Sequence, residues 1–227
     1  MKFLPTTKEE MKSLGWDSID VLLISGDTYL DTSYNGSALI GKWLVEHGFK
    51  VGIIAQPEVD VPDDITRLGE PNLFFAISGG CVDSMVANYT ATKKRRQQDD
   101  FTPGGENNKR PDRAVLVYSN MIRRFFKGTT KKIVISGIES SLRRITHYDY
   151  WTNKLRKPIL FDAKADILSY GMGEMSMLQL ANALKNGEDW QNIRGLCYLS
   201  KEPKEDYLSL PSHADCLADK DKFIEAY

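Results

Sequence analysis

The densest group of side chains capable of chemistry lies in one short segment of this sequence. It holds carboxylates at Glu139 and Asp149, guanidiniums at Arg143 and Arg144, and an imidazole at His147. His147 and Asp149 could serve as an acid and base pair, and Glu139 would pair with Arg143 on a helix because they are four residues apart. The alternatives to catalysis are that the histidine has a structural role and that the cluster only positions a ligand.

This segment directly follows an apolar run, residues 133–136, that opens onto Gly137. A buried strand ending in glycine places the next side chains at the carboxyl edge of a sheet, where open α/β folds bind ligands. Consecutive helical residues point about 100° apart, so Arg143 and Arg144 cannot share one role. We expect one to bind a local carboxylate such as Glu139, and the other to face the cleft or a neighbouring domain.

Two further turns bring polar residues to the same edge. The first has neither the glycine spacing of a dinucleotide site nor a P-loop lysine; it holds Gly26, Asp27, Tyr29, Asp31, Tyr34, Asn35 and Gly36. In the second, Gly171 and Gly173 permit close approach of the backbone to a ligand, and Glu174 suits a helix start. The alternatives are that the first turn is an ordinary connecting loop and that Glu174 only caps its helix. We predict a main cleft lined by Asp27, Tyr29, Gly137, Glu139, Gly171 and Glu174.

Apolar runs alternate with helical patterns along most of the chain. Such alternation predicts an α/β fold with a doubly wound, mostly parallel, Rossmann-like sheet. The strands are expected at residues 20–25, 51–55, 73–78, 133–136 and 166–170, with an edge strand at 196–199. We predict an extension at 1–19, the α/β domain at 20–200 and a linker at 201–227.

The long connection at residues 93–113 is charged and rich in turn residues. Its basic run, residues 93–96, is followed by Asp99 and Asp100, which favours a self-neutralised, solvated surface. A flexible segment that closes over an anionic ligand, or packs on a neighbouring domain, is the alternative.

The composition excludes several classes of protein. The 227 residues carry a formal net charge of -1, which gives no strong signal for nucleic acid. No apolar run is long enough to span a membrane, and the start lacks a secretory signal, so we expect a cytoplasmic protein. Cys81, Cys197 and Cys216 are too widely spaced for a metal site, and we expect reduced thiols and no iron–sulfur cluster on this chain alone.

Several long motifs make the chain resemble the amino-terminal part of the YgiQ-type radical SAM proteins, an uncharacterised family. They include GDTYLD at 26–31, GIIAQP at 52–57, YTATKKRRQQDDFTPGG at 89–105, KRPDRA at 109–114, GIESSLRRITHYDYW at 137–151 and KADILSYG at 164–171. The strand and helix pattern at 166–199 is also similar to the cobalamin-binding-like domains that precede radical SAM barrels.

The resemblance implies a 4Fe-4S cluster and S-adenosylmethionine in the full-length protein. Both need a C-x-x-x-C-x-x-C motif, which this chain lacks and which the family carries in a carboxyl-terminal barrel. Cobalamin is a further implied ligand, but the D-x-H-x-x-G turn is absent at Asp27, and we expect weak cobalamin binding or none.

Three functions remain open at this point. The first is a domain, non-catalytic alone, that presents a ligand or an unknown substrate to its own carboxyl-terminal radical SAM domain. The second is a self-contained hydrolase or transferase that uses Glu139, His147 and Asp149. The third is a purely structural scaffold.

Overall fold

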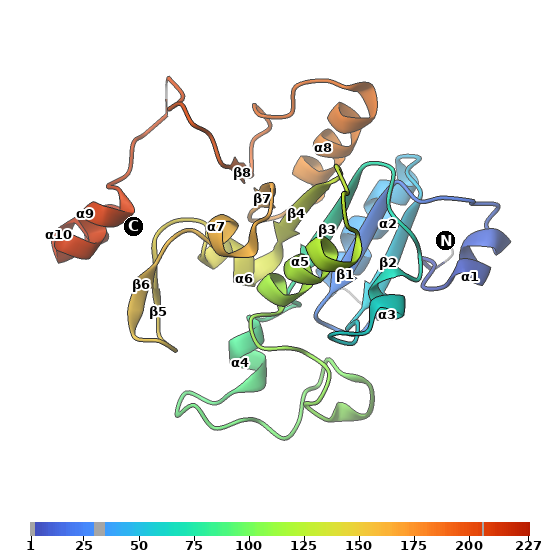
Figure 1. Cartoon of the computed structure of the whole chain (residues 1–227), viewed down its shortest axis with the longest axis horizontal. Helices are drawn as coiled ribbons and strands as arrows, with labels where there is room; N and C mark the ends of the chain where they lie inside the picture. The colour runs from blue at the N-terminus through green and yellow to red at the C-terminus, as the bar shows by residue number, and fades with distance from the viewer. Residues whose placement is uncertain (1–2, 30–34, 206) are drawn as a thin grey trace.

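A six-stranded sheet in the order β2-β1-β3-β4-β7-β8 forms the centre of the molecule (Figure 1). The structure, a computed structural model, describes residues 3–29, 35–205 and 207–227. All neighbouring strands run parallel except β8, which pairs antiparallel with β7. The strands are β1 (Val21–Ser25), β2 (Val51–Ala55), β3 (Phe74–Ser78), β4 (Lys132–Ser136), β7 (Ile167–Ser169) and β8 (Leu196–Tyr198).

The predicted doubly wound, mostly parallel sheet is confirmed. Every strand of the sheet lies within one residue of its predicted bounds at each end. The reason is that parallel strands are covered on both faces and read as continuous apolar runs. In β1, for example, all five residues are buried.

Helices cover both faces of the sheet, and side chains alternate between them. Leu22 and Ile24 of β1 face the core beneath α5, whereas Val21 and Leu23 face the core beneath α2 and α8. Helices α2 (Gly36–Glu46) and α8 (Glu174–Asn186) contact each other on one face. On the other face α5 (Ala114–Phe125) contacts α3 (Pro62–Thr66) and α7 (Ile159–Ala163).

Several small elements surround this core. A hairpin of β5 (His147–Asp149) and β6 (Lys154–Arg156) follows α6 (Gly137–Leu142). The remaining short elements are α1 (Lys8–Ser13), α4 (Ser84–Asn88), the 3-10 turn η1 (Pro103–Gly105), α9 (His213–Ala218) and α10 (Lys220–Glu225). The division into segments 1–19, 20–200 and 201–227 stays a prediction.

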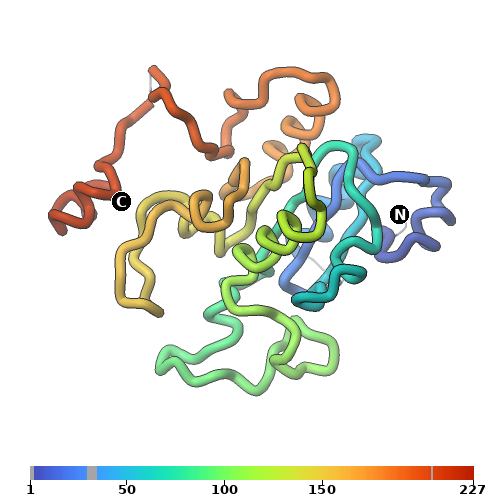
Figure 2. Tube along the Cα trace, in the orientation of Figure 1, coloured from blue at the N-terminus to red at the C-terminus, as the bar shows by residue number. Residues whose placement is uncertain are grey.

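The long connection between α4 and α5 runs away from the sheet and returns to it (Figure 2). It packs on the first turn after β1, because the Phe101 carbonyl accepts a hydrogen bond from the Thr28 amide at 2.8 Å. Gln56 Nε2 also donates to Thr102 Oγ1 at 2.7 Å. At the end of the chain, the Tyr227 hydroxyl donates to the Thr146 carbonyl oxygen beside the hairpin at 3.1 Å. No helix among the described residues has the length and apolar character that crossing a membrane requires.

Candidate functional site

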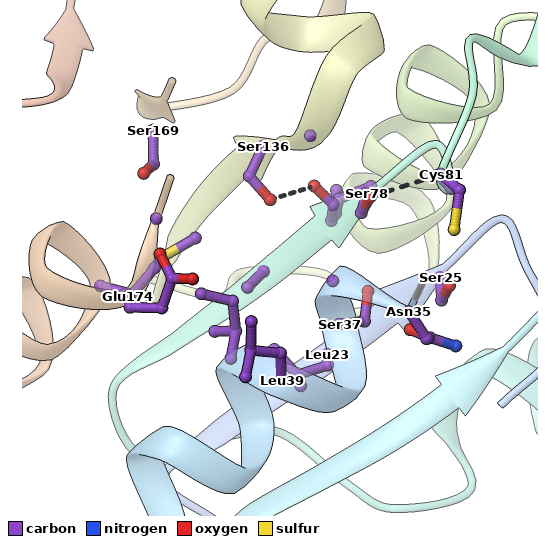
Figure 3. Close-up of a pocket in the computed structure, with 18 of the residues that line it drawn as sticks. Leu23, Ser25, Asn35, Ser37, Leu39, Ser78, Cys81, Ser136, Ser169 and Glu174 are labelled. Atoms are coloured by element: carbon purple, nitrogen blue, oxygen red, sulfur yellow. Dashed lines mark hydrogen bonds between the residues drawn. The ribbon is translucent and has the colours of Figure 1, made fainter. Parts of the chain in front are cut away.

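A cleft of about 310 Å³ opens at the carboxyl edge of the sheet, between the starts of α2 and α8 (Figure 3). Its walls are aliphatic and include Leu23, Ile40, Ala76 and Met177. Apolar walls with a few convergent polar groups are typical of small-molecule sites. The polar lining consists of Ser25, Asp27, Asn35, Ser37, Ser78, Cys81, Ser136, Ser169 and Glu174.

Four serines, one at the end of each central strand, form the floor of the cleft. The strand register aligns Ser25 with Ser78 and Ser78 with Ser136, and it pairs the residues just before Ser136 and Ser169. All four share the face of the apolar residues that pack under α2 and α8. Ser25 and Ser78 each accept a hydrogen bond from a following amide, and Ser136 donates to the Ile77 carbonyl at 3.1 Å. The row presents neutral hydroxyls to whatever occupies the cleft.

The structure brings four of the six predicted lining residues together. Asp27, Gly137, Gly171 and Glu174 all line the cleft. Gly137 has φ +81, and a Cβ there would lie 2.7 Å from Ser78 Oγ, so glycine is needed for both backbone and space.

The other two predicted lining residues lie elsewhere. The Tyr29 hydroxyl accepts a hydrogen bond from the Leu4 amide at 3.0 Å, which ties it to the amino-terminal segment. Glu139 is buried beneath the edge. Asp31 and Tyr34 of the first turn lie outside the described residues.

Glu139 joins the starts of two helices. Its carboxylate accepts hydrogen bonds from the Ser84 amide at 3.0 Å and the Val115 amide at 3.3 Å, in the first turns of α4 and α5. Burial, followed by the nearby charge of Asp83, raises the pKa of Glu139. The predicted ion pair between Glu139 and Arg143 is wrong, because Arg143 forms its ion pair with Asp83 and meets Glu139 only at the carbonyl oxygen, at 3.0 Å.

Arg144 makes contacts different from those of Arg143, and both residues lie beyond Leu142, the last residue of α6. It is exposed, donates to the Ser141 carbonyl at 2.8 Å, and lies over the ring of Tyr170 at 5.4 Å. Neither it nor Arg143 lines the cleft.

His147 and Asp149 share β5 but form no acid and base pair. His147 Nδ1 lies 3.2 Å from the Ile145 carbonyl oxygen, and burial lowers the pKa of the imidazole. Burial alone would raise the pKa of Asp149, but hydrogen bonds from Thr152 and Arg113 outweigh it and lower that pKa to about 2. No hydrogen bond between described residues joins any two of Glu139, His147 and Asp149, and none of the three lines the cleft. Glu139 and His147 do line one small separate cavity, together with Arg143.

The most deeply buried cation, Arg110, was missed by the sequence analysis. Its side chain is 0% exposed and lies 2.7 Å from Asp27 and 3.1 Å from Asp99. The run 93–96 is exposed, as predicted for a solvated surface, but Asp99 does not neutralise it because Asp99 is buried against Arg110. The only sequence signal for Arg110 was its place in a charged loop of unusual length.

Cys81 lies beside Asp27 at the rim of the cleft. Its amide donates to Asp27 Oδ2 at 2.6 Å. Burial, with the hydrogen bond to Asp27, raises the pKa of the thiol to about 12. A raised pKa disfavours the thiolate, which is the nucleophilic form of cysteine.

The cysteines do not form a cluster site. Cys81 follows β3, Cys197 lies in β8 and Cys216 in α9. Within the part of the chain that the structure describes, no three His, Cys, Asp or Glu side chains gather to hold a metal ion. The three thiols therefore do not fit a 4Fe-4S cluster, which needs convergent cysteine ligands. For cobalamin, the cleft-lining residues include no histidine that could ligate cobalt.

The fold is that of a Rossmann-like α/β domain with a cleft at the carboxyl edge of its sheet. The family model described as Radical SAM N-terminal matches residues 3–227, and the chain belongs to this family. It is 94% identical over its whole length to a UPF0313 protein of Fusobacterium nucleatum, of which it covers 40%. A UPF0313 protein of Methanocaldococcus jannaschii is 49% identical over 99% of the chain, which covers 38% of that relative. The chain thus spans about two fifths of the length of these relatives, which are the YgiQ-type proteins that the motifs indicated.

The fold also has a solved counterpart. The radical S-adenosylmethionine methyltransferase TsrM from Kitasatospora setae, solved with cobalamin and a [4Fe-4S] cluster bound, matches 81% of this chain with a TM-score of 0.54. The match covers 28% of TsrM at 17% sequence identity. This likeness shows a shared fold.

Proposed function

We propose that this chain is the amino-terminal domain of a longer radical SAM protein, and that it holds a ligand or substrate in the edge cleft without catalysing a reaction alone. The cleft itself carries the proposal. It opens at the edge where α/β domains bind ligands, and its polar lining includes serine hydroxyls at the ends of four strands and the carboxylates of Asp27 and Glu174.

Exposed apolar side chains beside the cleft support contact with another domain. Ile138 and Leu142 project from α6, and Met172 and Met175 lie at the start of α8, where Met172 is 88% exposed. Grouped exposed apolar residues are typical of interaction surfaces. We infer that the remaining three fifths of the longer relatives cover this edge.

The cofactors of the family belong to that remaining part in this proposal. The 4Fe-4S cluster and S-adenosylmethionine need ligands that the described residues of this chain do not supply. Cobalamin, if it binds at all, would lack a histidine ligand from the cleft, and we expect weak affinity for it. The carboxyl-terminal radical SAM domain is the expected partner.

Hydrogen–deuterium exchange tests the arrangement. The full-length Fusobacterium relative and this chain alone are compared under the same conditions. We expect amides 138–142 and 170–175 to exchange more slowly in the full-length protein, whereas amides 126–131, at the opposite edge of the sheet, exchange equally in both. Equal exchange at all three segments would contradict the proposal.

Two variants of the full-length protein separate a presenting domain from a scaffold. Leu142→Asp places a charge on the proposed contact surface and should abolish the protection. Leu39→Trp adds bulk at the cleft, where Leu39 is half exposed. In a presenting domain the cleft stays open and this variant keeps the protection. In a scaffold the partner fills the cleft, and the protection is lost.

A further inference from the structure

The electrostatic character of the cleft is one-sided. Carboxylates stand at both of its ends, Asp27 after β1 and Glu174 at the start of α8. None of the described residues that line it is a lysine, arginine or histidine. A ligand with a negative charge would therefore meet no counter-charge from a lining side chain.

Glu174 is the more accessible of the two carboxylates. It is half-buried, and it forms no ion pair with the described part of the chain. Figure 3 shows its carboxylate turned into the cleft, across from Ser78 and Asn35. An unpaired carboxylate beside apolar walls attracts a cation more strongly than one in open water, because the local dielectric is lower.

Asp27 adds to the negative potential despite its guanidinium neighbour. It is 2% exposed, and Arg110 Nη2 lies 2.7 Å from its Oδ1. No N–H group points at this oxygen with hydrogen-bond geometry, and Oδ1 has no hydrogen-bond partner. Arg110 also forms an ion pair with Asp99, at 3.1 Å. Two carboxylates share one guanidinium, so one negative charge is left over beside the cleft.

The two helix starts could in principle favour an anion, since helix N-termini carry partial positive charge. A side chain caps the start of α2, whereas no described side chain caps the start of α8. Asn35 Oδ1 accepts from the Ala38 amide at 3.1 Å at the start of α2. Glu174 places its own charge in the first turn of α8. The helix dipoles therefore do not reverse the preference set by the carboxylates.

We infer that the cleft takes a small primary amine, with its ammonium group against Glu174 and its apolar body between Ile40 and Met177. This inference rests on the proposed function, since it names the chemical class of the ligand that the same cleft would hold. The serine hydroxyls of the floor fit polar substituents of such a molecule, because Ser25 and Ser78 accept from backbone amides and keep their own protons to donate.

Three probes with one ring and different end groups test the charge preference. They are 2-phenylethylamine, 2-phenylethanol and phenylacetate, titrated into this chain and followed by NMR chemical shifts of residues 36–40 and 171–177. A charge-assisted hydrogen bond predicts that the amine binds about tenfold more tightly than the alcohol. The carboxylate should bind most weakly.

Glu174→Gln identifies the carboxylate responsible. This variant should weaken amine binding about tenfold, to the level of the alcohol, and leave alcohol binding unchanged. Glu188→Gln, just beyond the other end of α8, is the matched control and should bind all three probes as the parent chain does.

Three results would overturn the inference: no binding by any probe, equal or tighter binding of the alcohol or carboxylate, or amine affinity unaffected by Glu174→Gln. None of these three results affects the outcome of the hydrogen–deuterium exchange experiment on the full-length protein. If protection of the edge appears there while the amine preference fails, the ligand class is wrong and the presenting domain stands.

Discussion

The carboxyl edge of the sheet has two sides built from different kinds of residue. On the side of α2 and α8 the edge is open, and serines and aliphatic side chains form a cleft. On the side of α4 and α5 it is closed, and buried charged groups such as Glu139 and Arg110 join the loops to one another. We call these the open side and the closed side.

The difference teaches that chemical residue types do not by themselves mark a binding site. Glu139, Arg143 and Asp149 are the most reactive-looking residues of the sequence, yet their hydrogen bonds go to backbone amides or neighbouring charges. Buried ionic groups are costly unless they are paired or hydrogen-bonded. The charged groups of the closed side therefore bind one another and nearby backbone amides. The polar groups of the open side are mostly neutral hydroxyls.

The largest expected effect concerns the closed side. Arg110→Met leaves Asp27 and Asp99 buried without their guanidinium and should lower the free energy of unfolding by about 3–5 kcal/mol. Urea denaturation measures this. Arg124→Met is the control, because its ion pair with Asp60 is 62% and 68% exposed, and it should cost less than about 1 kcal/mol. Similar losses of unfolding free energy in both variants would show that the buried Arg110 contributes no more to stability than an exposed ion pair does.

Close packing of the closed side predicts the next effect. A Cβ on Gly79 would lie 2.6 Å from Glu139 Oε2, so Gly79→Ala must displace that carboxylate from the two helix starts. The expected loss of stability is about 1–3 kcal/mol. Gly36→Ala on the open side meets no atom within 4 Å and should change stability by less than about 0.5 kcal/mol. A tolerated Gly79→Ala would argue against a rigid network.

The charge on Asp149 predicts a pH-dependent effect. Its pKa is lowered to about 2, so the carboxylate stabilises the fold above about pH 4, and this contribution is lost as pH falls towards 2. Asp149→Asn should therefore destabilise the chain by on the order of 1 kcal/mol at pH 7, with a difference that shrinks in acid. Thermal unfolding between pH 2 and pH 7 measures it, with the exposed Asp17→Asn as control. A difference that does not vary with pH would contradict the assignment.

The smallest effect is expected on the open side. Ser136→Ala removes one hydrogen bond from a half-buried hydroxyl and should cost about 0.5 kcal/mol. Ser119→Ala removes a fully buried bond from α5 to the Ala163 carbonyl at the end of α7 and should cost about 1–1.5 kcal/mol. Chemical denaturation of both variants compares a hydroxyl of the cleft with a hydroxyl of the buried core. A larger loss of unfolding free energy for Ser136→Ala would mean that the serine row mainly stabilises the fold.

The sheet and the edge that carries the cleft could be predicted from the amino-acid pattern. Buried parallel strands need continuous apolar runs on account of the helices on both faces, so β1 to β4 and β7 could be located by inspection. Residues directly after such strands must lie at the carboxyl edge. This is why Asp27, Gly137, Gly171 and Glu174 were predicted correctly as lining residues.

Only the tertiary structure decided which side of that edge each side chain serves. Glu139 is only two residues beyond Gly137 at the end of β4, but α6 turns its carboxylate under α4 and α5. Arg110 reaches Asp27 across 83 positions of sequence because a long loop folds back on the first turn. Contacts of this kind depend on how loops return to the sheet, and no local pattern or spacing encodes that path. The sequence set where the edge lies, and packing divided it into an open side and a closed side.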